Sequence, residues 1–184
     1  EYAEREGVPA LMITASHNPP TDNGIKLVGS DGVELSVSDL ERVEDTFSTE
    51  AFEPVEWDAV GADRAVEGVG QRYVDELLSA VDRGRIEGSD LTVAVDPGHG
   101  AGSLTSPAFF RRLGCKVVTV NAQPDGRFPG RDPEPVPENL DDLCRLVRAA
   151  DADLGIAHDG DADRAVFVDE TGEPIEGDAT LAAL

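Results

Sequence analysis

Residues 153–168 read Asp-Leu-Gly-Ile-Ala-His-Asp-Gly-Asp-Ala-Asp-Arg-Ala-Val-Phe-Val. The apolar runs at 154–157 and 165–168 are short and bounded by turn residues, which predicts two strands joined by an acidic loop. In extended backbone, alternate side chains face the same way, so aspartates at alternate positions can direct their carboxylates to one point. Hard oxygen ligands suit Mg²⁺, so the loop is a candidate magnesium site. Its aspartates are Asp159, Asp161 and Asp163.

Other interpretations of this loop have to be weighed. Its aspartates and Glu170 also fall on the ligand spacing of a calcium EF-hand, but Arg164 stands where that loop needs glycine, and the flanks are strand-like where helices are required. A solvated acidic turn stays open as an alternative in so acidic a chain. We interpret His158 as an edge-of-strand residue rather than a ligand, because the aspartates already supply hard ligands.

Ser16 follows the apolar run at 10–13, and open α/β sheets place their ligand sites at the carboxyl ends of strands. The adjacent His17 suggests a serine hydrolase. However, consecutive side chains in extended backbone face apart, and the Gly-x-Ser-x-Gly elbow is absent because Thr14 and Asn18 hold its glycine positions. Hydrolysis is therefore disfavoured, and an ordinary turn serine remains the alternative.

The order of the apolar patterns predicts an α/β fold with mixed, mostly parallel sheets flanked by helices. Ser38 and Glu41 fit a capping box that opens one of the helices. Glycines near residue 84 end the first part of the chain, so we expect two domains, 1–84 and 85–184. Strands are expected at residues 10–13, 24–28, 91–95, 116–120, 153–157 and 165–169, and further helices at 71–81, 107–113 and 137–149.

Several segments resemble the α-D-phosphohexomutase family, which includes phosphoglucomutase, phosphomannomutase and phosphoglucosamine mutase. The resemblance implies that residues 1–84 form the later part of the family's first domain and residues 85–184 its second domain. It covers nearly the whole chain, with the matching segments in the family's order. These segments are Ile13–Pro20, Asp22–Lys26, Val95–Ser103, Asp132–Leu140 and Asp159–Arg164.

The resemblance also implies roles for individual residues. Ser16 matches the phosphoserine, Lys26 the general base, and His17 and Arg164 would line the transfer site. One Mg²⁺ per active site is implied, with hexose 1,6-bisphosphate as activator. The implied ligands of that ion are Asp159, Asp161, Asp163 and a phosphate oxygen on Ser16.

The implied reaction interconverts hexose 1-phosphate and hexose 6-phosphate, of glucose or mannose, through a bisphosphorylated sugar. Phosphoglucosamine mutase is the alternative within the family. Outside it, a sugar-phosphate phosphatase would share both motifs, and a non-catalytic binding domain would have no reason to keep all the motif residues. The family often has histidines near Gly130 and Arg131, positions that we do not connect with the chemistry. The sugar-selecting domains are not matched, so we expect no turnover from this chain alone.

The chain carries a net charge of −23, and its only lysines are Lys26 and Lys116. A field of that sign repels nucleic acid and anionic membranes, so neither is expected as a partner. A 40% content of hydrophobic residues argues for a packed core rather than disorder. With no signal peptide or membrane span in the pattern, we expect a cytoplasmic protein with Cys115 and Cys144 in its core. The oligomeric state stays open.

This charge pattern resembles the proteins of salt-accumulating halophiles, because high ionic strength shortens the Debye length and screens carboxylate repulsion. We therefore predict that the melting temperature rises between dilute buffer and molar KCl. Calorimetric melting at both salt concentrations tests this, and an unchanged melting temperature contradicts it.

Overall fold

The computed structural model describes residues 1–183 and divides into two compact units. The first unit consists of Glu1–Ile13 and Ile25–Val69, and the second of Thr14–Gly24 and the chain from Gly70 onward. The expected family-domain boundary after residue 84 stays a prediction. Helix α3 (Val69–Ala80) belongs with the second unit because it packs there through a buried apolar cluster. The central members of that cluster are Val74, Leu78 and Leu113.

The first unit contains α1 (Tyr2–Glu6), an antiparallel pair of strands, β1 (Ala10–Ile13) and β2 (Ile25–Val28), and α2 (Val37–Ser48). The residue that caps α2 is Ser36, whose hydroxyl accepts a hydrogen bond from the Asp39 N–H at 3.3 Å. The capping box predicted at Ser38 was wrong by two residues, because Ser36 is the last residue with extended backbone before the helix.

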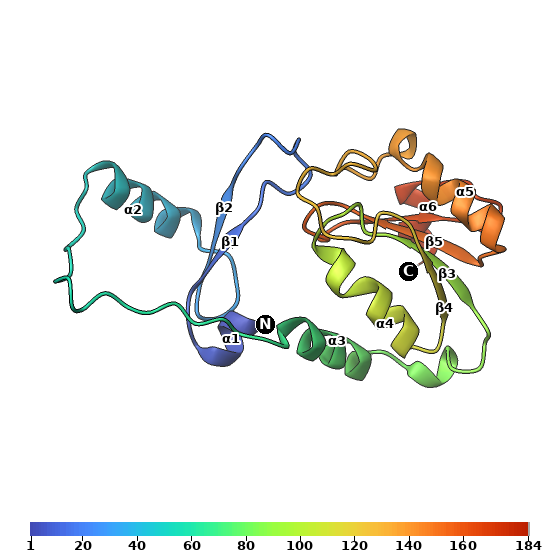
Figure 1. The fold of residues 1–184 in the computed structure, drawn as a ribbon, viewed down its shortest axis with the longest axis horizontal. Coiled ribbons are helices and arrows are strands. Elements are labelled where there is room, and N and C mark those ends of the chain that lie inside the picture. The colour runs from blue at the N-terminus through green and yellow to red at the C-terminus, as the bar shows by residue number, and fades with distance from the viewer. Residues whose placement is uncertain (184) are drawn as a thin grey trace. The chain divides into compact units, whose positions relative to one another are not determined.

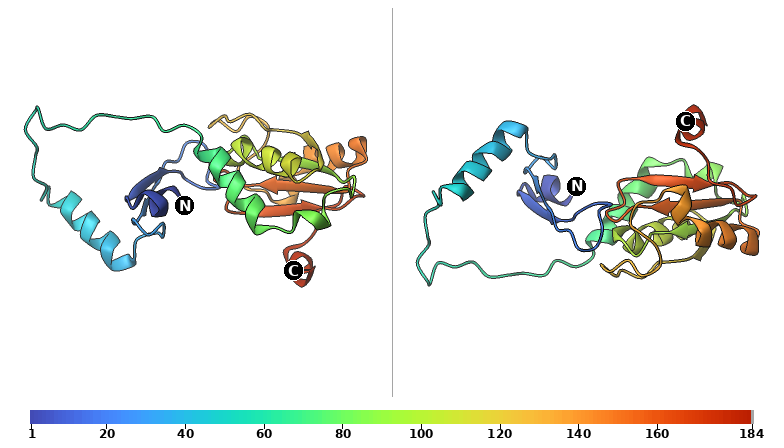
Figure 2. Two further views of the ribbon diagram at one scale, coloured as in Figure 1. Left: turned by 90° about the horizontal axis from the view of Figure 1, so that it is seen from below. Right: turned by 90° about the horizontal axis from the view of Figure 1, so that it is seen from above.

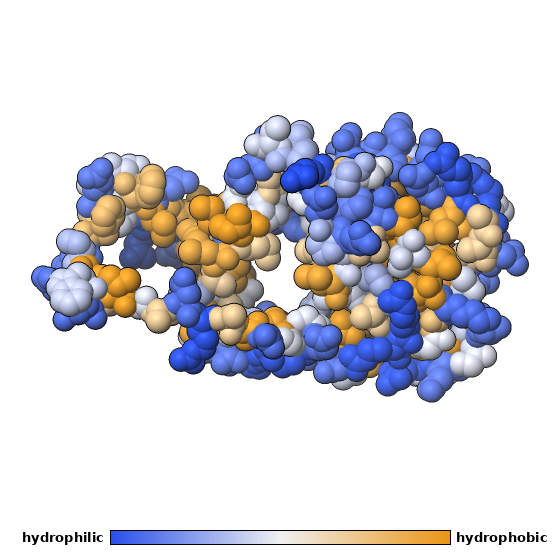
Figure 3. All heavy atoms as spheres, in the orientation of Figure 1, coloured by the Kyte–Doolittle hydropathy of each residue, from blue (hydrophilic) through white to orange (hydrophobic). Residues whose placement is uncertain are grey.

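Apolar side chains of the first unit lie largely on its surface, and Figure 3 shows them over β1, β2 and α2. Ile13 is 70% exposed and Phe47 is 80% exposed, whereas Ala3 is the only buried residue in the described part of this unit. A two-stranded sheet needs further packing to be stable in water. The first unit therefore holds little core of its own.

The second unit is built on a four-stranded sheet (Figure 1). Its strands lie in the order β4-β3-β5-β6; the first three are parallel, and β6 pairs with β5 in the antiparallel sense. The predicted α/β class, with a mostly parallel sheet and an antiparallel edge, is confirmed. The strands are β3 (Thr92–Asp96), β4 (Lys116–Thr119), β5 (Leu154–His158) and β6 (Ala165–Val168).

Helices cover both faces of this sheet. On one face, α5 (Asp141–Ala150) packs Leu143 and Val147 against a cluster that includes Ala94 of β3. On the other face, α4 (Ser106–Arg112) packs Phe110 against the adjacent strand residues, and α3 lies beside α4 (Figure 2). Strands buried on both sides read as continuous apolar runs, which is why these segments were recognisable in the sequence.

The remaining helical segments are short. The helix expected at 137–149 is a 3₁₀ turn, η3 (Pro137–Asn139), followed by α5, because Leu140 breaks the helical backbone between them. Two other 3₁₀ turns, η1 (Arg83–Arg85) and η2 (Ala101–Leu104), follow α3 and β3. The last helix described is α6 (Gly177–Ala183). Within the described part of the chain, every helix is too short or too polar to span a lipid bilayer.

Both cysteines are free and pack in the second unit, as expected from their apolar surroundings. Cys144 is 8% exposed among the residues under α5, and Cys115 packs beside α4. Burial raises the pKa of both thiols and so favours their protonated form.

Gly155 in β5 allows α5 to approach the sheet. A methyl group on Gly155 would lie 2.7 Å from a Val147 methyl carbon and 2.9 Å from the Val168 Cβ. We predict that Gly155→Ala lowers the free energy of unfolding by about 1 to 3 kcal/mol, as overpacked cores do. Urea unfolding measures this. Gly126→Ala is the matched control, because its added methyl meets nothing within 4 Å; equal stability of the two variants would disprove the packing argument.

Candidate active site and metal centre

The acidic loop between β5 and β6 brings its three aspartates together. One carboxylate oxygen from each of Asp159, Asp161 and Asp163 lies within 4.8 Å of the others. The loop is not extended as the sequence argument assumed, since Ala162 has a left-handed backbone with φ of 63°. The carboxylates converge because the loop curls back on itself.

Asp159 is the buried member of this group, with no exposed surface. Burial raises the pKa of its carboxyl group, the Arg164 N–H hydrogen bond opposes the rise, and the charges of Asp161 and Asp163 add to it. A carboxylate in this environment is stabilised in its charged form by a bound cation.

Ser16 lies in the loop Thr14–Gly24, which belongs to the second unit. Its hydroxyl oxygen is 3.3 Å from Asp161 Oδ1 and 3.4 Å from Asp159 Oδ2. The structure thus places the serine of the first motif against the aspartates of the second, although 143 residues separate Ser16 from Asp159.

The backbone of Ser16 is left-handed, with φ of 54°, and its Oγ is 3.3 Å from the adjacent His17 Nδ1. The assumption of extended backbone, from which we argued that the two side chains face apart, was therefore wrong. The absence of the Gly-x-Ser-x-Gly elbow still stands against a hydrolase.

Close backbone contacts hold the serine loop on the acidic loop. Thr14 Oγ1 accepts a hydrogen bond from the Ser16 N–H at 2.9 Å and donates to Asp161 Oδ2 at 3.4 Å. A Cβ on Gly160 would lie 2.4 Å from the Ser16 carbonyl oxygen, so only glycine permits this approach. The Gly160 carbonyl in turn accepts a hydrogen bond from the Ala101 N–H at 3.0 Å.

The other predicted site residues lie in different settings. The Arg164 side chain is about half exposed, and its guanidinium is 3.6 Å from the Glu134 carboxylate, while its backbone N–H binds Asp159. Lys26 lies on β2 of the first unit, where its ammonium is 3.9 Å from Glu34. The catalytic roles of these residues, and of His17, stay predictions.

His158 uses both ring nitrogens for contacts within the protein. Nδ1 is 3.1 Å from the Arg164 carbonyl oxygen, and Nε2 is 2.9 Å from Ser106 Oγ. A carbonyl can only accept, so Nδ1 carries a proton. This arrangement supports the interpretation of His158 as a structural residue at the end of a strand.

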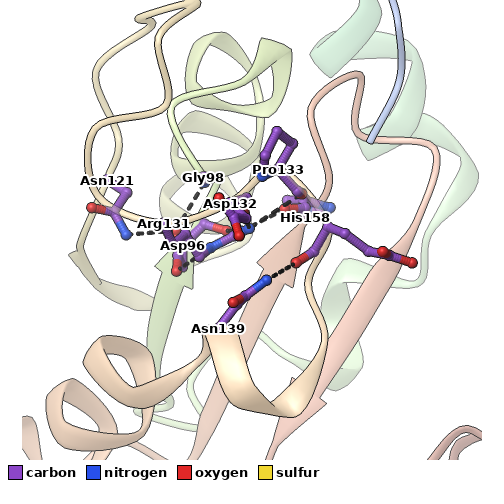
Figure 4. A network of polar contacts seen from close by, with 9 residues as sticks. Asp96, Gly98, Asn121, Arg131, Asp132, Pro133, Asn139 and His158 are labelled. Carbon is purple, nitrogen blue, oxygen red and sulfur yellow. Dashed lines mark hydrogen bonds and ion pairs between the residues drawn. The ribbon is translucent and has the colours of Figure 1, made fainter. Parts of the chain in front are cut away.

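The sequence reasoning missed a buried ion pair beside the acidic loop (Figure 4). Arg131 Nε donates to Asp96 Oδ2 at 2.8 Å, and the two side chains are 4% and 0% exposed. A signal was present, because Asp96 ends an apolar strand and a carboxylate buried there needs a cation or several donors. Gly98 N–H and Asn121 Nδ2 are its other donors.

A cavity of about 480 Å³ opens beside the serine loop. Carboxylates on its wall can accept hydrogen bonds from hydroxyl groups. Its lining residues are His17, Pro19, Asp132, Pro133, Glu134, Val136, Glu138 and Asn139.

The donor set fits a divalent cation of the Mg²⁺ type. Its side-chain ligand atoms are hard oxygens, and two of the three carboxylates lie within hydrogen-bonding distance of Ser16 Oγ. A phosphate on Ser16 would add a further oxygen ligand.

Models of two protein domains match the chain. One, described as phosphoglucomutase/phosphomannomutase alpha/beta/alpha domain I, matches residues 2–54, and the corresponding domain II matches residues 71–172. The chain belongs to the phosphoglucomutase/phosphomannomutase family. The resemblance seen in the sequence is thereby confirmed.

Individual relatives agree with this assignment. The chain is 48% identical over 171 residues to a phosphoglucomutase/phosphomannomutase from Thermococcus kodakarensis, and 46% identical over 174 residues to a probable phosphoglucosamine mutase from Methanobrevibacter smithii. A solved phosphoglucomutase/phosphomannomutase family protein from Burkholderia thailandensis superposes with a TM-score of 0.75 at 31% identity.

These matches cover most of the chain but a minor part of each relative. They take in 93%, 95% and 92% of the chain and 37%, 38% and 35% of the three relatives, respectively. The chain thus spans less than two fifths of their length.

We predict that Mg²⁺ raises the melting temperature of the chain and that Asp159→Asn removes most of this response. Saturation to a hundred times the dissociation constant is worth on the order of 2 to 3 kcal/mol. Without metal, Asp159→Asn should be at least as stable as the parent at neutral pH. The folded-state pKa of Asp159 is raised, so its charged form costs stability above that pKa, and the cost disappears as the pH falls through it.

Calorimetry with and without Mg²⁺ measures both effects. Asp151→Asn is the control, because it removes the same charge at the opposite end of β5, where Asp151 is exposed. A Mg²⁺ response equal in the two variants would show that the ion does not bind at Asp159.

Proposed function

We propose that this chain carries the phosphoryl-transfer site of a phosphohexomutase that interconverts hexose 1-phosphate and hexose 6-phosphate. The observation that carries the proposal is the position of Ser16 Oγ, within 3.4 Å of two carboxylates of the acidic loop. A cation held by these carboxylates would lie beside the serine oxygen, and this arrangement suits phosphoryl transfer.

The reaction is balanced by two transfers through the same serine. Phosphorylated Ser16 gives its phosphoryl group to the free hydroxyl of the sugar monophosphate; the bond from Ser16 Oγ to phosphorus breaks and a bond from the sugar oxygen to phosphorus forms. The bisphosphate turns round, and Ser16 Oγ takes back the phosphoryl group from the other position. The net change is a shift of phosphate along the hexose, without hydrolysis.

Different residues of the chain are proposed for the different steps of this cycle. Lys26 is proposed to accept the proton of the attacking sugar hydroxyl, and His17 and Arg164 to contact the transferring group. Asp159, Asp161 and Asp163 hold the cation. Bound there, Mg²⁺ neutralises phosphate charge and polarises phosphorus.

The proposed substrates are glucose and mannose phosphates, with glucosamine phosphate as the alternative. The relatives include proteins named phosphoglucomutase/phosphomannomutase and phosphoglucosamine mutase. The residues of the site do not distinguish between these sugars. Hexose 1,6-bisphosphate is proposed as the activator that phosphorylates Ser16, with one Mg²⁺ per site. A cytoplasmic location, and the lack of nucleic-acid and membrane partners, remain predictions from the charge and the sequence pattern.

We predict that incubation of the full-length protein carrying this sequence with Mg²⁺ and glucose 1,6-bisphosphate adds one phosphoryl group to Ser16. Peptide mass spectrometry should locate it, and added hexose monophosphate should remove it without release of inorganic phosphate. Ser16→Ala should abolish labelling and lower kcat roughly 10⁴-fold or more, as losing a nucleophile does.

Ser30→Ala is the control, since Ser30 is an exposed serine of the first unit. Stoichiometric release of inorganic phosphate would instead identify a phosphatase. An unlabelled Ser16 in folded, metal-bound protein would leave a binding domain as the better reading.

A further inference from the structure

Arg131 is a buried charged side chain near the site, and Figure 4 shows its surroundings. Every N–H of its guanidinium has an acceptor. Nε donates to the Asp96 carboxylate, and Nη1 donates to the carbonyl oxygens of Asp132 at 2.9 Å and Pro133 at 3.3 Å. Nη2 donates to the carbonyl oxygens of Asp96 at 3.3 Å and His158 at 2.5 Å.

These acceptors join three parts of the second unit. Asp96 ends β3, His158 ends β5, and Asp132 and Pro133 line the cavity beside His17. The His158 carbonyl belongs to the peptide that continues into Asp159. A hydrogen bond that fixes this carbonyl also fixes the plane of that peptide, and with it the position of the Asp159 Cα.

The backbone beside the guanidinium leaves room for it only because residue 98 is glycine. Gly98 has φ of 57°, and a Cβ there would lie 2.6 Å from Arg131 Nη2. The next residue of the acidic loop is held from another segment, since the Ala101 N–H binds the Gly160 carbonyl. Asp159 therefore follows an anchored peptide, and its own carbonyl oxygen accepts a hydrogen bond from the Ala162 N–H at 3.3 Å.

We propose that Arg131, held by Asp96, is a positioning residue for the metal-binding loop. Its guanidinium fixes the His158–Asp159 peptide so that the Asp159 carboxylate points at Asp161 and Ser16. The same guanidinium joins the wall of the adjacent cavity to this loop. The inference rests on the proposed cation site. It gives a function to Arg131, a residue that the sequence alone did not connect with the chemistry.

A double variant separates positioning from stability. Removing one partner of a buried ion pair leaves a buried charge, whereas Asp96→Asn with Arg131→Gln removes both charges and is expected to fold. Mn²⁺ serves as the probe, and its dissociation constant is measured by electron paramagnetic resonance on the full chain, with urea unfolding in parallel. We expect Mn²⁺ affinity to fall about 10-fold to 100-fold, as for other residues that orient metal ligands. The single variant Arg131→Lys keeps the positive charge but lacks the planar set of guanidinium donors. Its Mn²⁺ affinity should therefore stay well below that of the parent chain.

Val147→Ala is the control for lost stability, because Val147 is fully buried on α5. It should lower the urea midpoint while Mn²⁺ affinity stays within about twofold of the parent, since it leaves the loop's hydrogen bonds intact. A folded double variant with the parent's Mn²⁺ affinity would overturn the inference alone. A parent chain that binds no Mn²⁺ would refute the cation site and this inference with it.

Discussion

Mutual repulsion among three aspartates is the constraint that the backbone around the acidic loop has to satisfy. Carboxylates within one coordination sphere repel one another, and Asp159 is buried as well, so the loop would open unless its backbone were held. Strands β5 and β6 fix its two ends by antiparallel pairing. Hydrogen bonds to the carbonyls of His158 and Gly160 then fix its interior.

The same constraint explains why uncharged groups do so much of the anchoring. Peptide N–H groups, a threonine hydroxyl and glycine contacts hold Ser16 against the loop. The deeply buried cation nearby, Arg131, is committed to Asp96 and to carbonyls. The Arg164 side chain is about half exposed and lies 3.6 Å from the Glu134 carboxylate.

Much of the fold could be predicted because its signals are local. Buried parallel strands appear as short apolar runs, and Ala165–Val168 beyond the acidic loop could be assigned to an antiparallel edge. Helix limits were less well predicted: Ser36 rather than Ser38 caps α2, since backbone conformation decides which serine can accept the first N–H. The compact units to which α3 and the loop after β1 belong could not be predicted, because both assignments depend on contacts distant in sequence.

The sequence by itself determined the chemical groups of the candidate site, the strand pattern around them and the family. Motif spacing and hydrophobic period are properties of neighbouring residues, so they can be read without coordinates. Only the tertiary structure decided that Ser16 faces Asp159 and Asp161, that its backbone is left-handed beside His17, and that Arg131 pairs with Asp96. These contacts join segments far apart along the chain, and each depends on how the strand ends pack together rather than on any local preference.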